Sequence, residues 1–307
     1  MMRILVTEPE YFDGDAVSIL ESCGDVVAKR MGKDELAEKI ADFDAIIVRI
    51  ETHLDKKVLA RAKRLRIIGS ATTGLNHIDV DYAGERGIRI INLHGTHTIP
   101  TAEHTMALIL SLSRKIPWAY RSVSEGKWER YRFIGEQLDG KTLGIIGIGR
   151  IGSKVAEYAK AFGMKIIAYD PYVKSSKDAK LVNLNSLLEN SDIITLHAAL
   201  TGESTSLICK HEFGLMKRNA LLINTARAGL IDNAALIEAL KDGKINGAAI
   251  DVFEDEPLSE RDFLIVEYAR NNSNLIITPH IGASTAEAAH EAGLEIAKGV
   301  AKALEKQ

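Results

Sequence analysis

The sequence predicts an α/β protein whose parallel sheets are covered by helices. Short β-rich runs alternate with helical stretches along the whole 307-residue chain, which is typical of parallel strands joined by helices. The runs after residue 140 are almost continuously apolar, as strands buried on both faces are. A glycine-rich turn joins one of these runs to a helical stretch. The length allows two domains, each with its own core.

The first third of the chain predicts a small α/β domain. Four runs are expected to form strands, at residues 4–7, 45–48, 66–69 and 88–92. Three helices are expected between them, each beginning with an acidic residue as the helix dipole favours, at residues 34–43, 55–63 and 79–86.

The remainder of the chain predicts a longer helical stretch and then a second, larger sheet. The stretch lies at residues 101–124, where Pro117 should kink or divide the helix. Residues 126–140 are predicted to form a loop anchored by aromatic side chains, among them Trp128 and Tyr131. Six strands then follow and predict a doubly wound parallel sheet, at residues 143–146, 166–169, 193–197, 221–224, 248–251 and 275–278.

Composition argues against several classes of protein. The formal net charge of -3 provides no general attraction for nucleic acid or an anionic membrane. Cys23 and Cys209 lie far apart and have no metal-ligand spacing, so we expect neither a metal site nor a disulfide, and a reducing compartment. The first residues lack the pattern of a signal peptide, and no apolar run approaches about 20 residues, so we expect neither a signal peptide nor a membrane helix, and a cytoplasmic protein.

The segment GIGRIG at residues 147–152 predicts a dinucleotide-binding turn. It lies between a predicted strand and a predicted helix, and this context gives the glycine pattern its weight. Gly147 suits the tight turn, Gly149 lets the backbone approach a pyrophosphate, and Gly152 permits close packing of the helix on the strand. The start of the helix supplies free N–H groups and a positive dipole to the phosphates.

Asp170 favours NAD as the dinucleotide. It ends the next strand, about 20 residues beyond the glycine segment, where a carboxylate accepts hydrogen bonds from the ribose hydroxyls. A carboxylate there would repel the additional phosphate of NADP. The alternative is a simple turn residue before Pro171, and Lys174 is the one nearby group that argues for NADP.

Polar side chains follow three later strands and are candidates for catalysis. Arg227, Glu256 and His280 each come shortly after an apolar strand, where ligands bind in open α/β sheets. Taken alone, the histidine could cap a helix, the arginine could form a surface ion pair, and the glutamate could be part of an acidic turn. Their occurrence at three strand ends favours a common site.

In order and spacing these motifs resemble the D-isomer-specific 2-hydroxyacid dehydrogenase family, and the resemblance covers essentially the whole chain. Residues 126–130, 140–152 and 280–285 are most similar to members that act on 3-phosphoglycerate. The resemblance implies NAD-dependent oxidation of 3-phosphoglycerate to 3-phosphohydroxypyruvate, with His280 as acid and base, Glu256 as its partner and Arg227 as the clamp for the substrate carboxylate. The residue types suit these roles: imidazole titrates near neutral pH, a carboxylate favours the protonated ring, and a guanidinium binds carboxylates with a fixed fork of donors.

The resemblance also implies contacts with the cofactor and the substrate. Besides the three glycines and Asp170, the expected cofactor contacts are Arg150, Ile151, Ala199, Thr225, Ala226, Asp251, Gly282 and Ala283, with Asp251 at the nicotinamide carboxamide. The expected substrate contacts are Thr73, Gly74, Arg49 and Arg130, of which the two arginines match positions that bind a phosphorylated substrate.

The resemblance further implies two domains and a homodimer. Residues 1–97 with 284–307 would form a smaller, flavodoxin-like substrate-binding domain, and residues 98–283 a Rossmann-type NAD-binding domain. The final helix, at residues 284–305, would return to the first domain. The stretch at residues 101–124 would form the dimer contact.

Three departures from the family pattern leave alternatives open. Ala228 replaces the usual glycine after Arg227, so that loop should take an ordinary backbone conformation. Residues 93–100 also differ, which puts the substrate preference in doubt, and no C-terminal regulatory domain is expected after residue 307. The alternatives are a reductase of glyoxylate, hydroxypyruvate or a related 2-keto acid, and a non-catalytic NAD-sensing interaction protein.

Overall fold

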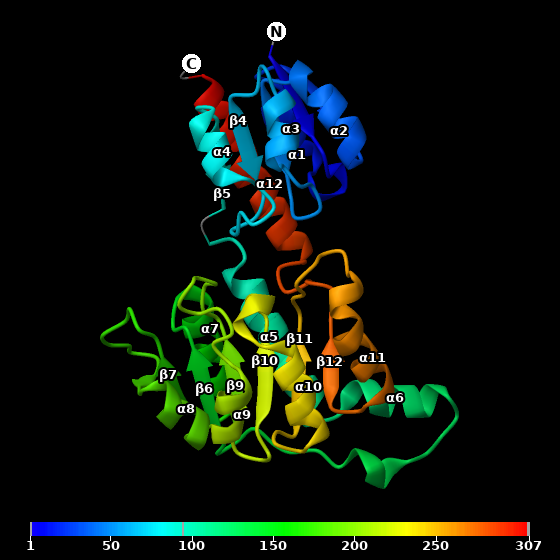
Figure 1. Cartoon of the computed structure of the whole chain (residues 1–307), viewed down its shortest axis with the longest axis vertical. Coiled ribbons are helices and arrows are strands. Elements are labelled where there is room, and N and C mark those ends of the chain that lie inside the picture. The colour runs from blue at the N-terminus through cyan, green and yellow to red at the C-terminus, as the bar shows by residue number, and fades with distance from the viewer. Residues whose placement is uncertain (1, 94, 306–307) are drawn as a thin grey trace. The chain divides into compact units, whose positions relative to one another are not determined.

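The computed structural model describes residues 2–93 and 95–305, which form two compact units (Figure 1). The first unit comprises residues 1–97 with 284–307, and the second comprises residues 98–283. Both contain a parallel sheet, so the predicted α/β class is confirmed. Of residues 93–100, whose sequence bears on substrate preference, His94 lies outside the described residues. Within the described part of the chain, no helix combines the length and apolarity needed to span a membrane.

The first unit has a five-stranded sheet in the order β2-β1-β3-β4-β5, which is the flavodoxin-like order. Its strands are β1 (Arg3–Val6), β2 (Asp25–Ala28), β3 (Ala45–Val48), β4 (Ile67–Ser70) and β5 (Arg89–Asn92). Its helices are α1 (Gly14–Glu21), α2 (Lys33–Lys39), α3 (Lys56–Arg61), α4 (Val80–Glu85) and α12 (Ala286–Leu304), with short 3-10 helices η1 (Pro9–Tyr11) and η2 (Ile40–Asp42). The strand β2 was not predicted.

Local sequence sets the ends of the helices in this unit. The side chains of Asp13, Asp55 and Asp79 each accept a hydrogen bond from the backbone N–H three residues later, which caps α1, α3 and α4. The final helix α12 packs on β4 at Gly69, where an added Cβ would lie 2.8 Å from Ile296 and 2.9 Å from Val300. Glycine at this position therefore allows the chain's last helix to close one face of the sheet.

The second unit has a seven-stranded parallel sheet in the order β12-β11-β10-β9-β6-β7-β8. Its strands are β6 (Thr142–Ile146), β7 (Lys165–Tyr169), β8 (Lys180–Leu181), β9 (Ile193–Leu196), β10 (Leu221–Asn224), β11 (Gly247–Ile250) and β12 (Leu275–Ile277). The six predicted strands are all present, and the two-residue β8 is added at one edge. The strand order reverses between β6 and β9, which is where open α/β sheets bind ligands.

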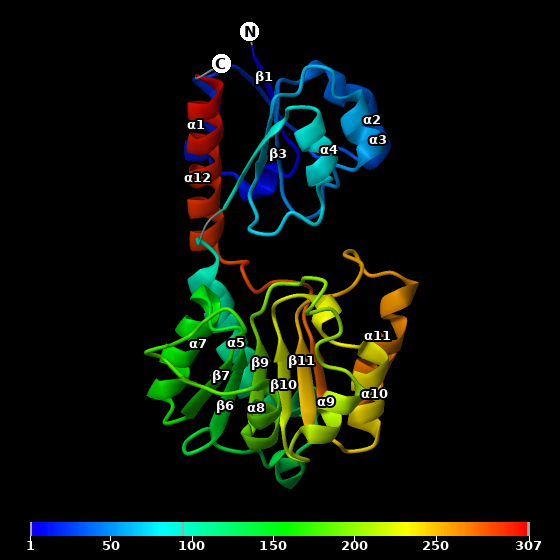
Figure 2. The ribbon, with the colours of Figure 1, turned by 60° about the vertical axis from the view of Figure 1, so that its left-hand side comes forward.

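Helices cover both faces of this second sheet, and a buried apolar cluster lies beneath each set (Figure 2). The helices of the unit are α5 (Thr98–Ser113), α6 (Ile116–Ser124), α7 (Arg150–Ala161), α8 (Leu184–Asn190), α9 (Lys210–Leu215), α10 (Asn233–Lys241) and α11 (Phe263–Asn271). Three 3-10 helices complete it, η3 (Arg130–Phe133), η4 (Ala228–Leu230) and η5 (Glu260–Asp262).

The stretch from α5 to η3 confirms one prediction and corrects another. Pro117 lies in the first turn of α6, and Lys115 before it has a left-handed φ of 54°, so the predicted division is confirmed. The prediction that aromatic side chains anchor the next loop is wrong for Trp128 and Tyr131, whereas Phe133 is partly buried. Trp128 is 83% exposed and Tyr131 is 81% exposed, because the loop leads away from the core instead of packing on it.

Candidate active site

The three candidate catalytic residues follow three neighbouring strands of the second unit. Arg227 comes after β10, Glu256 after β11 and His280 after β12, and these strands are adjacent in the sheet. Parallel strands end at the same edge, so the sheet order brings the three segments together.

His280 and Glu256 form a close pair. The Nδ1 atom of His280 lies 2.5 Å from Oε2 of Glu256, and Oε1 of Glu256 accepts a hydrogen bond of 3.0 Å from the N–H of Phe253. Both oxygens of the carboxylate are therefore held in place. Among the described residues none hydrogen-bonds the Nε2 atom of His280, which makes this atom the one available for proton exchange with a ligand.

The loop that carries His280 is fixed by a buried carboxylate. His280 has a left-handed φ of 52°, which is uncommon for a residue with a side chain. Oδ1 of Asp251 accepts hydrogen bonds from the Thr278 hydroxyl at 2.5 Å and the Ile281 N–H at 3.0 Å, and Oδ2 accepts one from the Gly282 N–H at 2.8 Å. These bonds hold the segment on both sides of His280, so the unusual backbone is stabilised by its surroundings.

Asp251 is charged despite its burial. Burial raises its pKa, but hydrogen bonds from His104 and Thr278 outweigh this effect, and the net pKa lies below the ordinary value. The side chain is completely buried, and its contacts are those of a residue that shapes the loop. Its expected contact with the nicotinamide carboxamide stays a prediction.

Arg227 lies on a turn that Asn224 shapes. Nδ2 of Asn224 donates to the carbonyl of Arg227 at 2.9 Å, and Oδ1 accepts from the N–H of Ala226 at 3.0 Å. Burial lowers the pKa of the Arg227 guanidinium, and the negative charge of Glu256 opposes that shift. Ala228 has no positive φ and begins η4, which confirms the ordinary backbone predicted for this position.

Asn224 and His104 were not predicted as site residues. Asn224 is the last residue of an otherwise apolar strand, and that exception in the pattern was the signal available in the sequence. His104 lies in α5, and its Nε2 is 3.2 Å from Asp251 Oδ1. Only the folded structure brings these two segments together.

The glycine segment has the geometry that a dinucleotide pyrophosphate requires. Gly147 has a φ of 91°, and an added Cβ would lie 2.7 Å from the backbone of His197 and Ala198 after β9. An added Cβ at Gly152 would lie 2.2 Å from the carbonyl oxygen of Gly147, so only glycine lets α7 approach the turn this closely. Gly149, the N-cap of α7, has open space at its Cβ position. The residues present therefore fit a dinucleotide.

Asp170 is directed to the same turn. Its Oδ2 accepts a hydrogen bond from the N–H of Ile148 at 3.1 Å, and its Oδ1 accepts one from the N–H of Tyr172 at 2.9 Å. Each carboxylate oxygen has a further lone pair that a ribose hydroxyl can use. The structure thus places the carboxylate beside the glycine segment, as the proposed ribose contact requires.

The other expected cofactor residues lie along the carboxyl edge of this sheet. Arg150 and Ile151 begin α7, and Ala199 follows β9 in an exposed position. Thr225 and Ala226 follow β10, where the Thr225 hydroxyl lies 2.9 Å from that of Thr105. Gly282 and Ala283 end the loop that begins after β12.

The expected substrate residues are divided between the two units. Arg49 follows β3, and Thr73 and Gly74 follow β4, at the carboxyl edge of the first sheet. Arg130 is exposed in η3, on the segment between α6 and β6. This segment leads from α6 to the amino end of β6 (Figures 1 and 2). Arg227, Glu256 and His280 follow the carboxyl ends of strands, so the structure does not bring Arg130 to them within the second unit.

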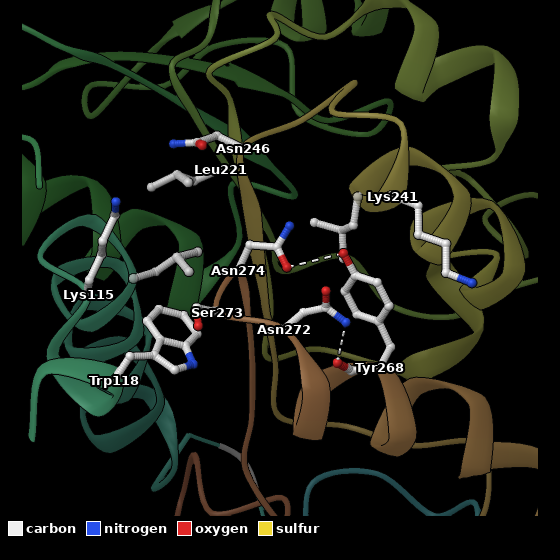
Figure 3. Close-up of a pocket in the computed structure, with 11 residues that line it drawn as sticks. Lys115, Trp118, Leu221, Lys241, Asn246, Tyr268, Asn272, Ser273 and Asn274 are labelled. Carbon is white, nitrogen blue, oxygen red and sulfur yellow. Dashed lines mark hydrogen bonds between the residues drawn. The ribbon is translucent and has the colours of Figure 1, made fainter. Parts of the chain in front are cut away.

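A cavity of about 540 Å³ lies at the other end of the second sheet (Figure 3). Leu221, Asn246 and Asn274 line it at the amino ends of β10, β11 and β12, together with Trp118 and Tyr268. The candidate catalytic residues follow the carboxyl ends of the same strands, so this cavity is separate from them.

The chain matches known proteins along nearly its whole length. Residues 106–282 match the family described as D-isomer specific 2-hydroxyacid dehydrogenase, NAD binding domain. The chain is 46% identical to a D-3-phosphoglycerate dehydrogenase of Methanocaldococcus jannaschii over 99% of its own length and 58% of that protein. It is 40% identical to a hydroxypyruvate reductase of Thermotoga maritima over 98% of both chains.

Solved structures agree with these matches. The TT0316 protein of Thermus thermophilus superposes with a TM-score of 0.91 at 34% identity, covering 100% of this chain and 98% of that one. The D-lactate dehydrogenase of Aquifex aeolicus, in complex with NAD and lactic acid, gives 0.85 at 30% identity, covering 99% and 94%. The chain spans little more than half the length of the phosphoglycerate dehydrogenases that it matches, at 58% and 56%.

Proposed function

The chain belongs to the D-isomer specific 2-hydroxyacid dehydrogenase family, and we propose that it interconverts 3-phosphoglycerate and 3-phosphohydroxypyruvate with NAD. The observation that carries the proposal is the His280–Glu256 pair, which shares one edge of the sheet with Arg227 and the glycine segment. The identity of 46% to a phosphoglycerate dehydrogenase supports the choice of substrate.

The residues of the site divide the reaction between them. His280 Nε2 accepts the proton of the substrate hydroxyl during oxidation and returns it to the carbonyl oxygen during reduction. Glu256 orients the ring through Nδ1 and stabilises its protonated form. Arg227 binds the substrate carboxylate and polarises the carbonyl oxygen. The nicotinamide, when bound, supplies the acceptor or donor of the hydride.

Arg49 supports a substrate that carries a second anionic group. Its guanidinium carbon lies 3.9 Å from the centre of the Tyr11 ring, and its Nε is buried with no hydrogen-bond partner among the described residues. Burial lowers the pKa of Arg49, while the negative charge of Glu8 opposes that shift. The Nε atom is enclosed, but Arg49 as a whole is partly exposed, and its positive charge suits an anionic group of the substrate. We therefore assign substrate binding to the first unit.

The test compares kcat/KM for two substrates in the unsubstituted protein and in a variant of Arg49. Reduction of phosphohydroxypyruvate and of hydroxypyruvate is followed by the loss of NADH absorbance. We expect phosphohydroxypyruvate to have the higher kcat/KM, and Arg49→Gln to lower it by about tenfold or more, since a charge-assisted hydrogen bond is worth about 1.5–3 kcal/mol. Turnover of hydroxypyruvate should change little. Arg89→Gln, an exposed arginine in the first unit, is the matched control and should leave both substrates unaffected.

A reductase of unphosphorylated 2-keto acids is the second candidate. It is supported by the hydroxypyruvate reductase of Thermotoga maritima, to which the chain is 40% identical. Faster turnover of hydroxypyruvate or glyoxylate than of phosphohydroxypyruvate, with no effect of Arg49→Gln, would establish this candidate in place of the first.

We also propose a homodimer formed through α6 and the loop after it. Five large apolar side chains of this segment are between 57% and 83% exposed, namely Tyr120, Val123, Trp128, Tyr131 and Ile134. Burial of such a surface against a second copy removes apolar area from water. Light scattering should give the mass of two chains. Trp128→Ser with Tyr131→Ser should shift the protein to the mass of one chain; a single-chain mass for the unsubstituted protein would overturn the proposal.

A further inference from the structure

A chain of hydrogen bonds lies behind the loop that follows β4. It begins at His77, which is 6% exposed and whose Nε2 lies 3.2 Å from the Ser70 hydroxyl. That hydroxyl lies 2.7 Å from the hydroxyl of Thr72, which in turn donates to the carbonyl oxygen of Gly74 at 2.7 Å. None of the roles assigned above to the active site uses His77 or Ser70.

The direction of every hydrogen bond in this chain follows from its last member. The Gly74 carbonyl can only accept, so the single hydrogen of the Thr72 hydroxyl is used there. Ser70 must therefore donate to Thr72, and His77 must donate to Ser70 through an Nε2–H. Burial, with a smaller effect from the charge of His53, lowers the pKa of His77 to about 4, so the ring is neutral at neutral pH.

The hydrogen bonds fix one side of the loop at residues 72–75, which we call the substrate loop. The Thr72 carbonyl accepts from the N–H of Leu93 at 3.1 Å, and the Thr73 carbonyl accepts from Asn92 Nδ2 at 3.1 Å. With the Gly74 carbonyl bound by Thr72, three successive carbonyl groups are engaged. Within the described part of the chain, the N–H groups of residues 73–75 have no acceptor.

This arrangement turns one backbone segment into a set of donors. Unpaired N–H groups at a loop are a binding surface for anions, and here they occur at the carboxyl edge of the first sheet. A flexible loop would lose conformational entropy on binding a ligand, whereas a loop that is already held does not. The side chains that hold the loop therefore affect ligand affinity without touching the ligand.

We propose that His77 is a positioning residue that acts through Ser70 and Thr72 to hold the substrate loop in its ligand-binding conformation. The inference rests on the proposed function, which places Thr73 and Gly74 at the substrate. It assigns to His77 an effect on substrate affinity and none on cofactor affinity, because the glycine segment and Asp170 belong to the other unit.

The experiment interrupts the chain of hydrogen bonds at two points. Thr72→Val removes the hydroxyl and keeps the side-chain shape; His77→Leu removes the donor, and His77→Gln keeps an N–H at a similar reach. The readouts are kcat and KM for the 2-keto acid, the Kd of NADH, and amide hydrogen exchange of residues 70–78. Ser22→Ala, which removes another hydroxyl that donates to a carbonyl in the first unit, is the control.

We expect Thr72→Val and His77→Leu each to raise the KM of the keto acid by about fivefold, which corresponds to one net hydrogen bond of about 1 kcal/mol. The Kd of NADH should stay within about twofold, and the amides of the substrate loop should exchange faster. His77→Gln should restore most of the affinity. The KM of the double variant, Thr72→Val with His77→Leu, should be no higher than the higher of the two single-variant values, because both substitutions break the same series of hydrogen bonds.

Two results would overturn the inference. One is an unchanged KM and unchanged exchange in Thr72→Val. The other is a lower melting temperature in His77→Leu without any change in KM, which would mean that the histidine only stabilises the fold. If the unsubstituted protein turns over no 2-keto acid, the proposed function fails; exchange of the substrate loop then decides the inference about His77 by itself.

Discussion

The proposed acid–base pair of His280 and Glu256 depends on the orientation of a single carboxylate. The two carboxylate oxygens of Glu256 contact His280 and the N–H of Phe253. In Glu256→Gln the side-chain oxygen can still accept from the Phe253 N–H, but His280 loses its charged partner. Glu256→Gln should lower kcat for the keto acid by about tenfold or more, since acid–base catalysis contributes about 100-fold to 10,000-fold, and should leave the melting temperature unchanged. Glu254→Gln, the same change at an exposed neighbour, should have no effect. Equal kcat values for the two variants would contradict the role of Glu256.

We expect the choice between NAD and NADP to depend on the charge of Asp170. Asp170→Asn keeps an oxygen for the N–H of Ile148 but removes the charge that repels the phosphate of NADP. We expect the ratio of kcat/KM with NADPH to that with NADH to rise by about tenfold, within the range of one charge-assisted hydrogen bond. Lys174→Ala tests the competing residue, and a larger effect of Lys174→Ala than of Asp170→Asn would refute the argument.

At this scale the sequence predicted residue types better than their geometry. Arg227, Glu256 and His280 were recognisable because charged and titratable side chains interrupt apolar patterns at strand ends. The left-handed backbone of His280 and the four donors around Asp251 could not be predicted from the sequence. They depend on contacts between residues that lie up to about 150 positions apart in the chain. Local pattern contains no information on such contacts.

In the glycine segment, the close packing of neighbouring elements determines which positions must be glycine. Gly152→Ala would place a Cβ 2.2 Å from the Gly147 carbonyl, so α7 would have to shift; we expect a loss of about 1–3 kcal/mol in unfolding free energy and weaker NADH binding. Gly149→Ala meets nothing within 4 Å and should leave the unfolding free energy nearly unchanged while weakening NADH binding. Urea unfolding and NADH titration separate the two effects. Tight NADH binding by Gly149→Ala would show that the pyrophosphate does not approach this residue.

Strands with a clear apolar pattern were predicted from the sequence, whereas the strand that is defined mainly by pairing with its neighbour was not. The strand β3 is wholly buried and continuously apolar, and β10 is wholly buried and apolar except for Asn224 at its end; both strands were expected. The strand β2 has exposed ends, DVVA in sequence, and pairs only with β1, so its sequence has no clear period. The exposed aromatics near Trp128 were misassigned because composition does not distinguish a core anchor from an unpartnered surface.

Each of the two units contains a histidine whose surroundings keep its ring neutral: His77 is buried, and His197 is partly buried with its Nδ1 enclosed. Burial lowers the pKa of His77 to about 4 and that of His197 to about 3, compared with 6.5 for an exposed ring. Below pH 6.5 the unfolded chain binds protons that the folded chain does not, so stability falls as the pH falls. Between pH 6.5 and its pKa in the folded protein, each histidine should lower the free energy of unfolding by about 1.4 kcal/mol per pH unit, or by about 2 kcal/mol in total at pH 5.

Urea unfolding at pH 7.5 and pH 5 tests this dependence. His197→Gln should reduce the loss of unfolding free energy between the two pH values, because the residue no longer titrates. His211→Gln, a change at an exposed histidine of the same unit, should leave the loss as it is. Equal losses in all three proteins would contradict the assignment of the pH dependence to these neutral rings.

At the scale of the whole molecule, the sequence predicted two α/β units because the alternation of strands and helices is repeated twice along the chain. The central claim of the proposed function is that His280 exchanges a proton with a 2-keto acid reduced by NADH. The most direct test is the kcat of the unsubstituted protein and of His280→Gln with phosphohydroxypyruvate and NADH. The account predicts a loss of about 100-fold or more in kcat with an unchanged Kd for NADH; near-normal turnover by His280→Gln would contradict it.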